Sequence, residues 1–394
     1  MKTVYLVNIS YGVAGAEKRF ANIWRELLNR NVVNAVLVIP EILKNKLALT
    51  GLLPFDDHPN IIAVKEYFLV HRIVSLFPFI SHLPYVFGIR RRLVTLKFRK
   101  ILNKLNDNYK NIVHFGLPCN LLPPPDLPLV FECVDSTFKC FNRIHYRRAS
   151  KLPAIVHCQT NRIKKAIDSI YSDKSIVRWQ TIVNPCCFAF YPDNKQRQDS
   201  NAEKIDILFM GRFSDEKSPL LFIHSIAILR DRGLIFNAYM LGEGPLFSKI
   251  QRLIKEYELG PFLKVAFSND TQVYLNKAKI FVSLQTEDNY PSQSLLEAMG
   301  AGCAVIASDV GETWKIVDEA VGYRVGLDAS HIADAIEKLI SDRSTLDRCC
   351  SEAALRVRTH FSSNAYVSYI ESIYDMAYNK FIDSKNGRQN PEHE

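Results

Sequence analysis

Several common signatures are missing from this sequence of 394 residues. Its nine cysteines form no C-x-x-C pair, and the adjacent pairs Cys186-Cys187 and Cys349-Cys350 are poor candidates for bridging to each other, so a reducing compartment fits better than a disulfide framework. No D-x-D occurs, and no group of His and Cys has the spacing of a metal site. The dinucleotide fingerprint G-x-G-x-x-G is also missing. We therefore expect neither a metal ion nor a cofactor.

Long uncharged apolar runs are scarce as well. Only the region around residues 67–105 approaches the 18 uncharged apolar residues that a membrane span requires. The first predicted strand lies close to Met1 with no signal peptide before it, so we expect a cytoplasmic protein. At 47% hydrophobic and 11% aromatic residues, the chain has enough apolar surface to form the cores of two or three domains.

Acidic side chains are absent between residues 67 and 105, where eight Lys and Arg occur. Pro78 and Pro84 interrupt the apolar part of this segment and argue against a spanning helix. Its aromatic residues and the basic run Arg90-Arg91-Arg92 favour a surface that lies on an anionic leaflet, which makes the protein peripheral on the cytoplasmic face of the membrane. The alternative is an ordinary pair of packed helices whose arginines are solvated.

The charge of the two halves differs in sign. Residues 1–185 hold 27 Lys and Arg against 12 Asp and Glu, whereas residues 186–394 hold 23 against 29. This asymmetry predicts two domains with different partners. A nucleic-acid partner is disfavoured, because no recognition motif accompanies the basic half.

Strand and helix patterns alternate along the chain, which predicts an α/β fold with parallel sheets. The β-branched run Val4–Ile9 opens the first sheet, and Ile205–Met210 opens the second after a polar stretch without apolar periodicity. The predicted organisation is an acceptor-side domain, a linker, a donor domain, a C-terminal helix that packs back on the first domain, and a frayed tail. The corresponding boundaries are 1–185, 186–204, 205–360, 361–381 and 382–394.

The stretch 281–312 is the most informative part of the sequence. It predicts a buried strand at Phe281–Leu284, a polar turn, a short helix that starts near Ser292, and a second buried strand at Ala304–Ala307. The polar cluster Glu287–Tyr290 therefore sits at the carboxyl end of a parallel strand, beside a helix N-terminus. Open α/β sheets bind ligands at this edge, and helix N-termini favour phosphate.

Four motifs fall at strand ends of the second domain in a fixed order. They are G-R-x-x-x-x-K at 211–217, G-E-G-P at 242–245, N-Y-P-S-Q-S-L-L-E-A-M-x-x-G at 289–302, and D-V-G-E at 309–312. In this order they resemble the retaining glycosyltransferases of family 4, strongly over 205–325 and weakly in the first domain. The resemblance implies the GT-B fold, in which two Rossmann-like domains face a cleft. The absence of D-x-D disfavours the single-domain glycosyltransferase fold that holds a cation with that pair.

The resemblance also implies roles. Arg212 and Lys217 would hold the donor diphosphate and neutralise it as it leaves, as catalytic residues. Glu297 would accept hydrogen bonds from the ribose hydroxyls, although Ser294-x-x-Glu297 also fits a capping box. The backbone N–H groups of the first helical residues would hold the distal phosphate. The full predicted donor-binding set is Gly12, Gly15, Gly211, Gly242, Glu243, Glu287, Asn289, Tyr290, Pro291, Ser292, Gln293, Ser294 and Glu297.

One position departs from the family pattern. The family has two glutamates separated by seven residues, and counting back from Glu297 gives Asn289, an amide that carries no charge. This favours a front-face reaction in which the departing phosphate takes the acceptor's proton. In the first domain, His114 at a predicted strand end is a further catalytic candidate, and Asp135 is a weaker one. A buried structural histidine is the alternative for His114.

The expected function is transfer of a sugar from a nucleotide-diphosphate sugar to a glycan or lipid-linked acceptor, in bacterial surface polysaccharide synthesis such as that of lipopolysaccharide. We expect a retaining and metal-independent reaction. A nucleotide-sugar epimerase or phosphorylase on the same fold, or a non-catalytic GT-B scaffold subunit, are the alternatives.

Overall fold

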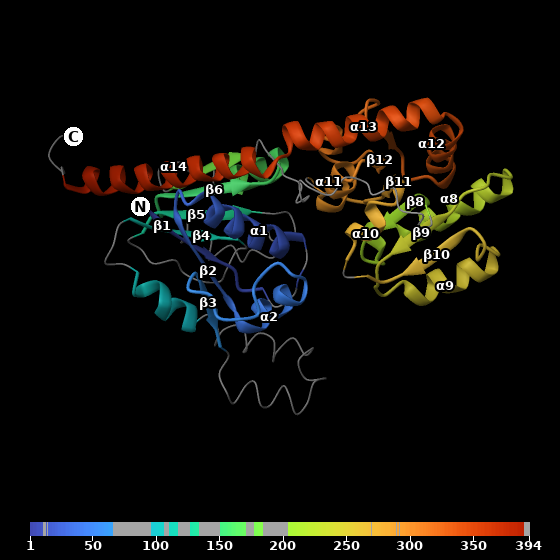
Figure 1. Ribbon diagram of the computed structural model, residues 1–394. Coiled ribbons are helices and arrows are strands. Elements are labelled where there is room, and N and C mark those ends of the chain that lie inside the picture. Colours follow the sequence, from blue (N-terminus) through green and yellow to red (C-terminus); the bar gives the residue numbers. More distant parts are fainter. Residues whose placement is uncertain are drawn as a thin grey trace. The chain divides into compact units, whose positions relative to one another are not determined.

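A computed structural model of the chain describes most of the sequence (Figure 1). The chain divides into two compact units, Met1–Pro185 with Val367–Glu394, and Cys186–Tyr366. The described residues are 1–10, 13, 15–65, 96–105, 110–116, 127–133, 150–170, 177–183, 204–268, 270–288, 290 and 292–389.

The first unit is built on a seven-stranded sheet in the order β3-β2-β1-β4-β5-β6-β7. All of its strand pairs are parallel, and nearly every residue of its central strands is buried, as expected for a sheet covered on both faces. Its strands are β1 Thr3–Val7, β2 Asn34–Pro40, β3 Ile61–Val64, β4 Asn111–Phe115, β5 Leu129–Cys133, β6 Ala154–Cys158 and β7 Gln180–Val183.

Helices cover this sheet. One face packs on Phe98 and Leu102 of the helix over 96–103 and on Ile163 of α7 (Asn161–Ile170). The helices α1 (Gly15–Arg30) and α2 (Glu41–Leu49) follow β1 and β2. The long helix α14 (Ser363–Gln389) belongs to this unit from Val367 on and lies along β5 and β6 in Figure 1.

The second unit has a six-stranded parallel sheet in the order β10-β9-β8-β11-β12-β13. Alternate residues of β8 divide between two cores: Ile207 and Phe209 pack with α8, α9 and α12, and Leu208 packs with α11 and α13. The strands are β8 Ile205–Met210, β9 Ala238–Leu241, β10 Leu263–Ala266, β11 Ala278–Ser283, β12 Ala304–Ser308 and β13 Gly322–Val325. The helices are α8 Pro219–Asp231, α9 Phe247–Glu256, α10 Gln272–Leu275, α11 Gln293–Gly300, α12 Ala329–Ser341 and α13 Arg343–His360, with single 3₁₀ turns η2 at Asp215–Lys217 and η3 at Thr313–Lys315.

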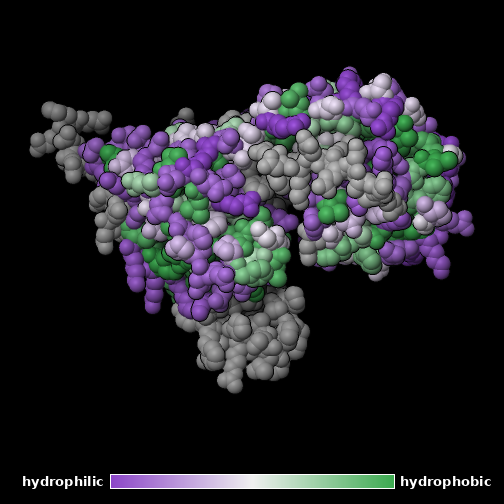
Figure 2. Space-filling view, viewed as in Figure 1, coloured by the Kyte–Doolittle hydropathy of each residue, from purple (hydrophilic) through white to green (hydrophobic). Residues whose placement is uncertain are grey.

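The two parallel sheets confirm the predicted α/β, Rossmann-like architecture of both halves. One boundary differs from the prediction: α14 continues to Gln389, eight residues into the segment predicted as a frayed tail. The visible face of the described residues is mainly hydrophilic, with hydrophobic residues in small groups (Figure 2). No helix among the described residues is long and apolar enough to cross a membrane. Of the basic segment 67–105, only 96–105 falls within the described residues, so the predicted membrane surface around Arg90-Arg91-Arg92 lies outside them.

Candidate functional site

The candidate site lies at the carboxyl edge of the second sheet, where turns follow β8, β9, β11 and β12. In a parallel sheet all these turns emerge at one edge. The structure brings the turns together through backbone and side-chain contacts, so motifs far apart in sequence form one surface.

Lys217 ends the 3₁₀ turn that follows β8. Its Nζ atom donates a hydrogen bond of 2.6 Å to Oε1 of Gln285, which follows β11. The side chain is half-buried, and this burial lowers the pKa of its ammonium group, although the neighbouring Glu216 opposes the shift. Arg212, on the same turn, is exposed. The two predicted cations therefore differ: Lys217 is fixed against the sheet edge, and Arg212 extends into solvent.

Gly242 and Gly244 of the G-E-G-P motif have a structural role. Gly242 has φ +152°, and a Cβ atom there would lie 1.9 Å from the carbonyl oxygen of Gly211. Gly244 has φ +155°, with Phe213 backbone atoms 2.5 to 2.9 Å from the position of its missing Cβ. The Phe213 N–H donates to the carbonyl oxygen of Glu243 at 2.8 Å, while the Glu243 side chain is exposed. These glycines allow the turns after β8 and β9 to interlock.

Gln285 connects the turns after β8 and β11 to Ser308, the last residue of β12. Besides accepting from Lys217, it donates from its backbone N–H to Ser308 Oγ at 2.8 Å and from Nε2 to Ser283 Oγ at 3.3 Å. The next residue, Thr286, donates from its N–H to the carbonyl oxygen of Glu216 at 3.1 Å. Gln285 was not among the predicted site residues, because nothing in its local pattern distinguishes it from other polar residues of the turn.

The helix α11 begins at Gln293, with Ser292 as its N-cap residue. The Ser292 side chain makes no capping hydrogen bond, and its Oγ atom instead lies 3.4 Å from Ser294 Oγ. The first N–H groups of a helix have no carbonyl partner within the helix, so this start offers donors to an anion. The Nε2 atom of Gln293 is buried and has no hydrogen-bond partner among the described residues.

Glu297 is the fifth residue of α11 and is half-buried. Because the N-cap is Ser292, Ser294 is the second helical residue and cannot start a capping box with Glu297. The capping-box interpretation of this pair is therefore wrong.

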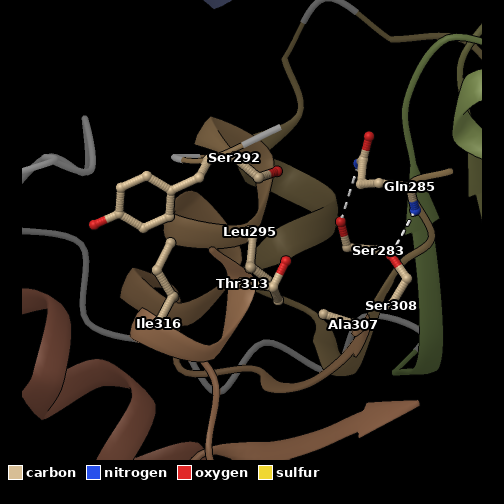
Figure 3. A pocket seen from close by; sticks show the side chains of 9 residues that line it. Ser283, Gln285, Ser292, Leu295, Ala307, Ser308, Thr313 and Ile316 are labelled. Carbon is tan, nitrogen blue, oxygen red and sulfur yellow. Dashed lines mark hydrogen bonds between the residues drawn. The ribbon is translucent and has the colours of Figure 1, made fainter. Parts of the chain in front are cut away.

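A small pocket opens between the turn after β11 and the turn after β12 (Figure 3). Figure 3 shows Ser283, Gln285 and Ser308 on one side and Ser292 and Thr313 on the other. The remaining lining residues are Tyr290, Leu295, Ala307 and Ile316. The pocket thus joins serine and threonine hydroxyls, an amide and the start of α11 in one recess.

The other predicted donor-binding residues are placed as follows. Glu287 is exposed on the turn after β11, and Gly211 donates its N–H to the Leu241 carbonyl oxygen at 3.0 Å. Gly15 is the first residue of α1 in the first unit. The predictions for Gly12, Asn289, Pro291 and Asp135 lie outside the described residues.

His114 is the fourth residue of β4 and is completely buried in the first unit. Its Nδ1 atom lies 3.0 Å from the Tyr374 hydroxyl, and the edge of its ring meets Phe20. Burial, with a smaller contribution from the charge of Arg19, lowers the pKa of His114 to about 3. Such surroundings are those of a neutral structural histidine, and they give its ring no exposed surface at which a substrate hydroxyl can bind.

The described residues were also compared with the requirements of a metal site. No three His, Cys, Asp or Glu side chains there are grouped so as to hold a metal ion.

Comparisons with known proteins show which proteins the chain is similar to. Residues 191–356 match the model of the family described as glycosyl transferases group 1. The chain is 24% identical over 227 residues to a GalNAc-alpha-(1->4)-GalNAc-alpha-(1->3)-diNAcBac-PP-undecaprenol alpha-1,4-N-acetyl-D-galactosaminyltransferase of Campylobacter jejuni, covering 56% of this chain and 61% of that protein. It is also 24% identical over 186 residues to the amylovoran biosynthesis glycosyltransferase AmsK of Erwinia amylovora, covering 45% of each. The alignments thus span about half the length of the curated relatives.

Solved structures match over nearly the whole chain. A mutant of S. aureus TarM in complex with Fondaparinux, alpha-GlcNAc-glycerol and UDP has a TM-score of 0.68 at 13% identity, with 95% of this chain and 100% of that chain covered. Anabaena Alr3699/HepE in complex with UDP and glucose has a TM-score of 0.66 at 14% identity, with 94% and 99% covered. At this identity the likeness concerns the fold. The chain therefore has the GT-B fold, and residues 191–356 are similar to the glycosyl transferases group 1.

Proposed function

We propose that this protein is a glycosyltransferase that moves a sugar from a nucleoside diphosphate sugar to a glycan or lipid-linked glycan acceptor during synthesis of a bacterial surface polysaccharide. The observation that carries the proposal is the fixed cation of Lys217, bound to Gln285, on the same sheet edge as the uncapped N-terminus of α11. Together they suit a diphosphate, because a helix start and a cation both favour an anion. The relatives act in the transfer of sugars to an undecaprenol-linked glycan and in amylovoran synthesis, as their names state, and they support the acceptor class.

In this mechanism the residues of the second unit bind and neutralise the donor. The N–H groups at the start of α11 hold the distal phosphate, and Glu297 accepts hydrogen bonds from the ribose hydroxyls. Lys217 and the exposed Arg212 offset the negative charge that grows on the diphosphate as the bond to the sugar breaks. Asn289 stands where the family has a carboxylate, so the leaving phosphate oxygen accepts the proton of the attacking hydroxyl. We propose a retaining outcome of the family 4 type, without a metal ion.

The test is a thermal-shift screen with the diphosphates and diphosphate sugars of uridine, guanosine and adenosine, followed by an assay for nucleoside diphosphate release with the best donor. We expect stabilisation by one nucleotide and a Lys217→Ala variant that binds it at least tenfold more weakly, since a contact between charged groups of this kind is worth about 1.5–3 kcal/mol. Lys249→Ala, at an exposed position of α9, is the matched control.

Two results would contradict the proposal in different ways. Absence of any nucleotide effect on the wild-type protein rules out the donor site. Nucleotide binding without turnover on any acceptor extract favours the non-catalytic scaffold, which the amide at position 289 keeps open.

A further inference from the structure

Two sets of contacts join the turn after β11 to the end of β12 and to the turn that follows it. The Gln285 N–H donates to Ser308 Oγ, and both residues line the pocket. Further along, Asp288 of the turn after β11 meets Gly311 and Glu312 of the turn after β12. The Asp288 Oδ1 atom accepts from the N–H of Glu312 at 3.4 Å and from the N–H of Tyr290 at 3.2 Å.

The lack of a side chain at Gly311 makes this contact possible. It has φ +55°, and a Cβ atom at this position would lie 2.1 Å from Asp288 Cγ and 2.3 Å from Asp288 Oδ1. The carboxylate of Asp288 therefore occupies the space that any other residue at 311 would need for its side chain. A residue without Cβ is required here both by the backbone conformation and by the neighbouring carboxylate.

A further contact joins the same two turns. Lys315 Nζ forms an ion pair of 2.6 Å with Glu312 Oε2 and lies 5.2 Å from the centre of the Tyr290 ring. Glu312 and Lys315 are both largely buried, with side-chain exposures of 14% and 25%. The Tyr290 ring, which lines the pocket, is thus held from the turn after β12 by a cation–π contact.

We propose that Asp288 is a positioning residue for the donor: it locks the turn after β11 to the turn after β12 and thereby fixes Tyr290 and the start of α11. This inference rests on the proposed function, because the donor phosphate is assigned to the start of α11. Asp288 is not among the residues that line the pocket. It acts by holding the turn in the conformation in which the helix start faces the pocket, so that binding does not have to order the turn.

The test compares Asp288→Ala and Asp288→Asn in the full-length protein, with Asp309→Asn as the control for loss of a charge at the same sheet edge. Asp309 is exposed, and its carboxylate pairs with Arg324 of β13. Hydrogen exchange is followed in peptides covering 285–296 and 309–316, and binding of uridine, guanosine and adenosine diphosphates is measured by calorimetry.

For Asp288→Ala we expect exchange in both peptides to be faster by about tenfold or more, since it loses hydrogen bonds to a charged acceptor. Nucleotide affinity should fall by about tenfold as the turn loses its preorganisation. Asp288→Asn keeps an acceptor oxygen and should recover most of both effects, and Asp309→Asn should resemble the wild type. Double substitution of Asp288 and Gly311 by alanine should cost less than the sum of the single changes.

Exchange in Asp288→Ala equal to that of the wild type would overturn the proposal, and so would faster exchange with undiminished nucleotide affinity. The exchange measurement is made without nucleotide. A wild-type protein that binds none of the three diphosphates therefore refutes the donor site, and the positioning role with it, while the exchange rates still report whether the two turns are locked.

Discussion

His114 offers a sharp test of the first unit, because a catalytic and a structural role predict opposite results. The side chain has no exposed surface and shares a hydrogen bond with Tyr374 of α14. Replacing His114 by Gln removes the titrating ring and keeps a group that can bind the Tyr374 hydroxyl. If His114 is structural, the variant changes how stability depends on pH and leaves sugar transfer largely intact.

The magnitude follows from the pKa of His114, which burial lowers to about 3 in the folded protein. In the unfolded chain a histidine binds its proton near pH 6.5. Between these values the unfolded state binds more protons, so the contribution of His114 to stability is fully present above about pH 6.5 and is lost as pH falls toward about 3. At about 1.4 kcal/mol per pH unit, the wild-type protein should lose roughly 2 kcal/mol through this group between pH 7 and pH 5.

The assay is urea unfolding at pH 7, 6 and 5, followed by tryptophan fluorescence. The chain has three tryptophans. Trp24 and Trp179 are buried in the first unit, and Trp314 is exposed in the second, so a Trp314→Phe background reports on the first unit. His360→Gln, at an exposed position of α13, controls for the loss of a histidine.

The quantity to compare is the change in unfolding free energy with pH in the wild type minus that in His114→Gln. Glu132 of the same sheet titrates too: burial raises its pKa, and its ion pair with Arg19 opposes the shift. Since both proteins contain this pair, its contribution cancels in the difference. Equal pH slopes in the two proteins would refute the structural role. Loss of transfer with an unchanged slope would support the prediction that His114 is a catalytic residue.

Three further predictions follow from the second unit and from the basic segment. Glu297→Gln should weaken binding of the preferred nucleotide by about tenfold, measured by calorimetry, because a neutral amide replaces the charged acceptor of the ribose hydroxyls; unchanged affinity would contradict that role. Gly244→Ala should lower the stability of the second unit by roughly 2–4 kcal/mol in calorimetric unfolding, owing to positive φ and the close Phe213 backbone, whereas Gly260→Ala, with open space around it, should not. Replacing the three arginines at 90–92 by glutamine should reduce co-sedimentation with anionic vesicles, since each is worth about 1 kcal/mol near such a surface; unaltered pelleting would exclude the membrane contact.

The strands of the second sheet could be predicted because the chain signals them locally. The runs at β8, β11 and β12 are apolar, short and bounded by turn residues, as buried parallel strands are. The edge strands β3 and β13 were not predicted. β13 contains Gly322 and Arg324 and so has no clear strand pattern, and β3 is an apolar run of only four residues. Their place is decided by pairing with β2 and β12 rather than by their own composition.

The candidate site could be predicted only in part, for a similar reason. Lys217 and the start of α11 stand out because their chemistry is visible in a few consecutive residues. The residues that hold them in place do not stand out in the sequence. Gln285 lies 68 positions from Lys217, and Asp288 lies 24 positions from the Glu312 N–H that it accepts from, so no local pattern reveals either contact.

The glycines show why a sequence motif alone does not establish that a ligand binds. In the sequence, Gly242 belongs to the predicted donor-binding set, and Gly244 lies in the same G-E-G-P motif. In the structure, the missing side chain of each leaves room for the backbone of the neighbouring turn, at Gly211 and Phe213. Gly311 likewise makes room for the Asp288 carboxylate. Three glycines of the family-like motifs are therefore needed for turns to pack on one another. It follows that a glycine motif can persist in a relative that no longer binds the ligand, as long as the turns still interlock. The motif alone therefore indicates the fold, and the chemistry has to be argued from the groups beside it, such as the fixed Lys217 cation and the uncapped start of α11.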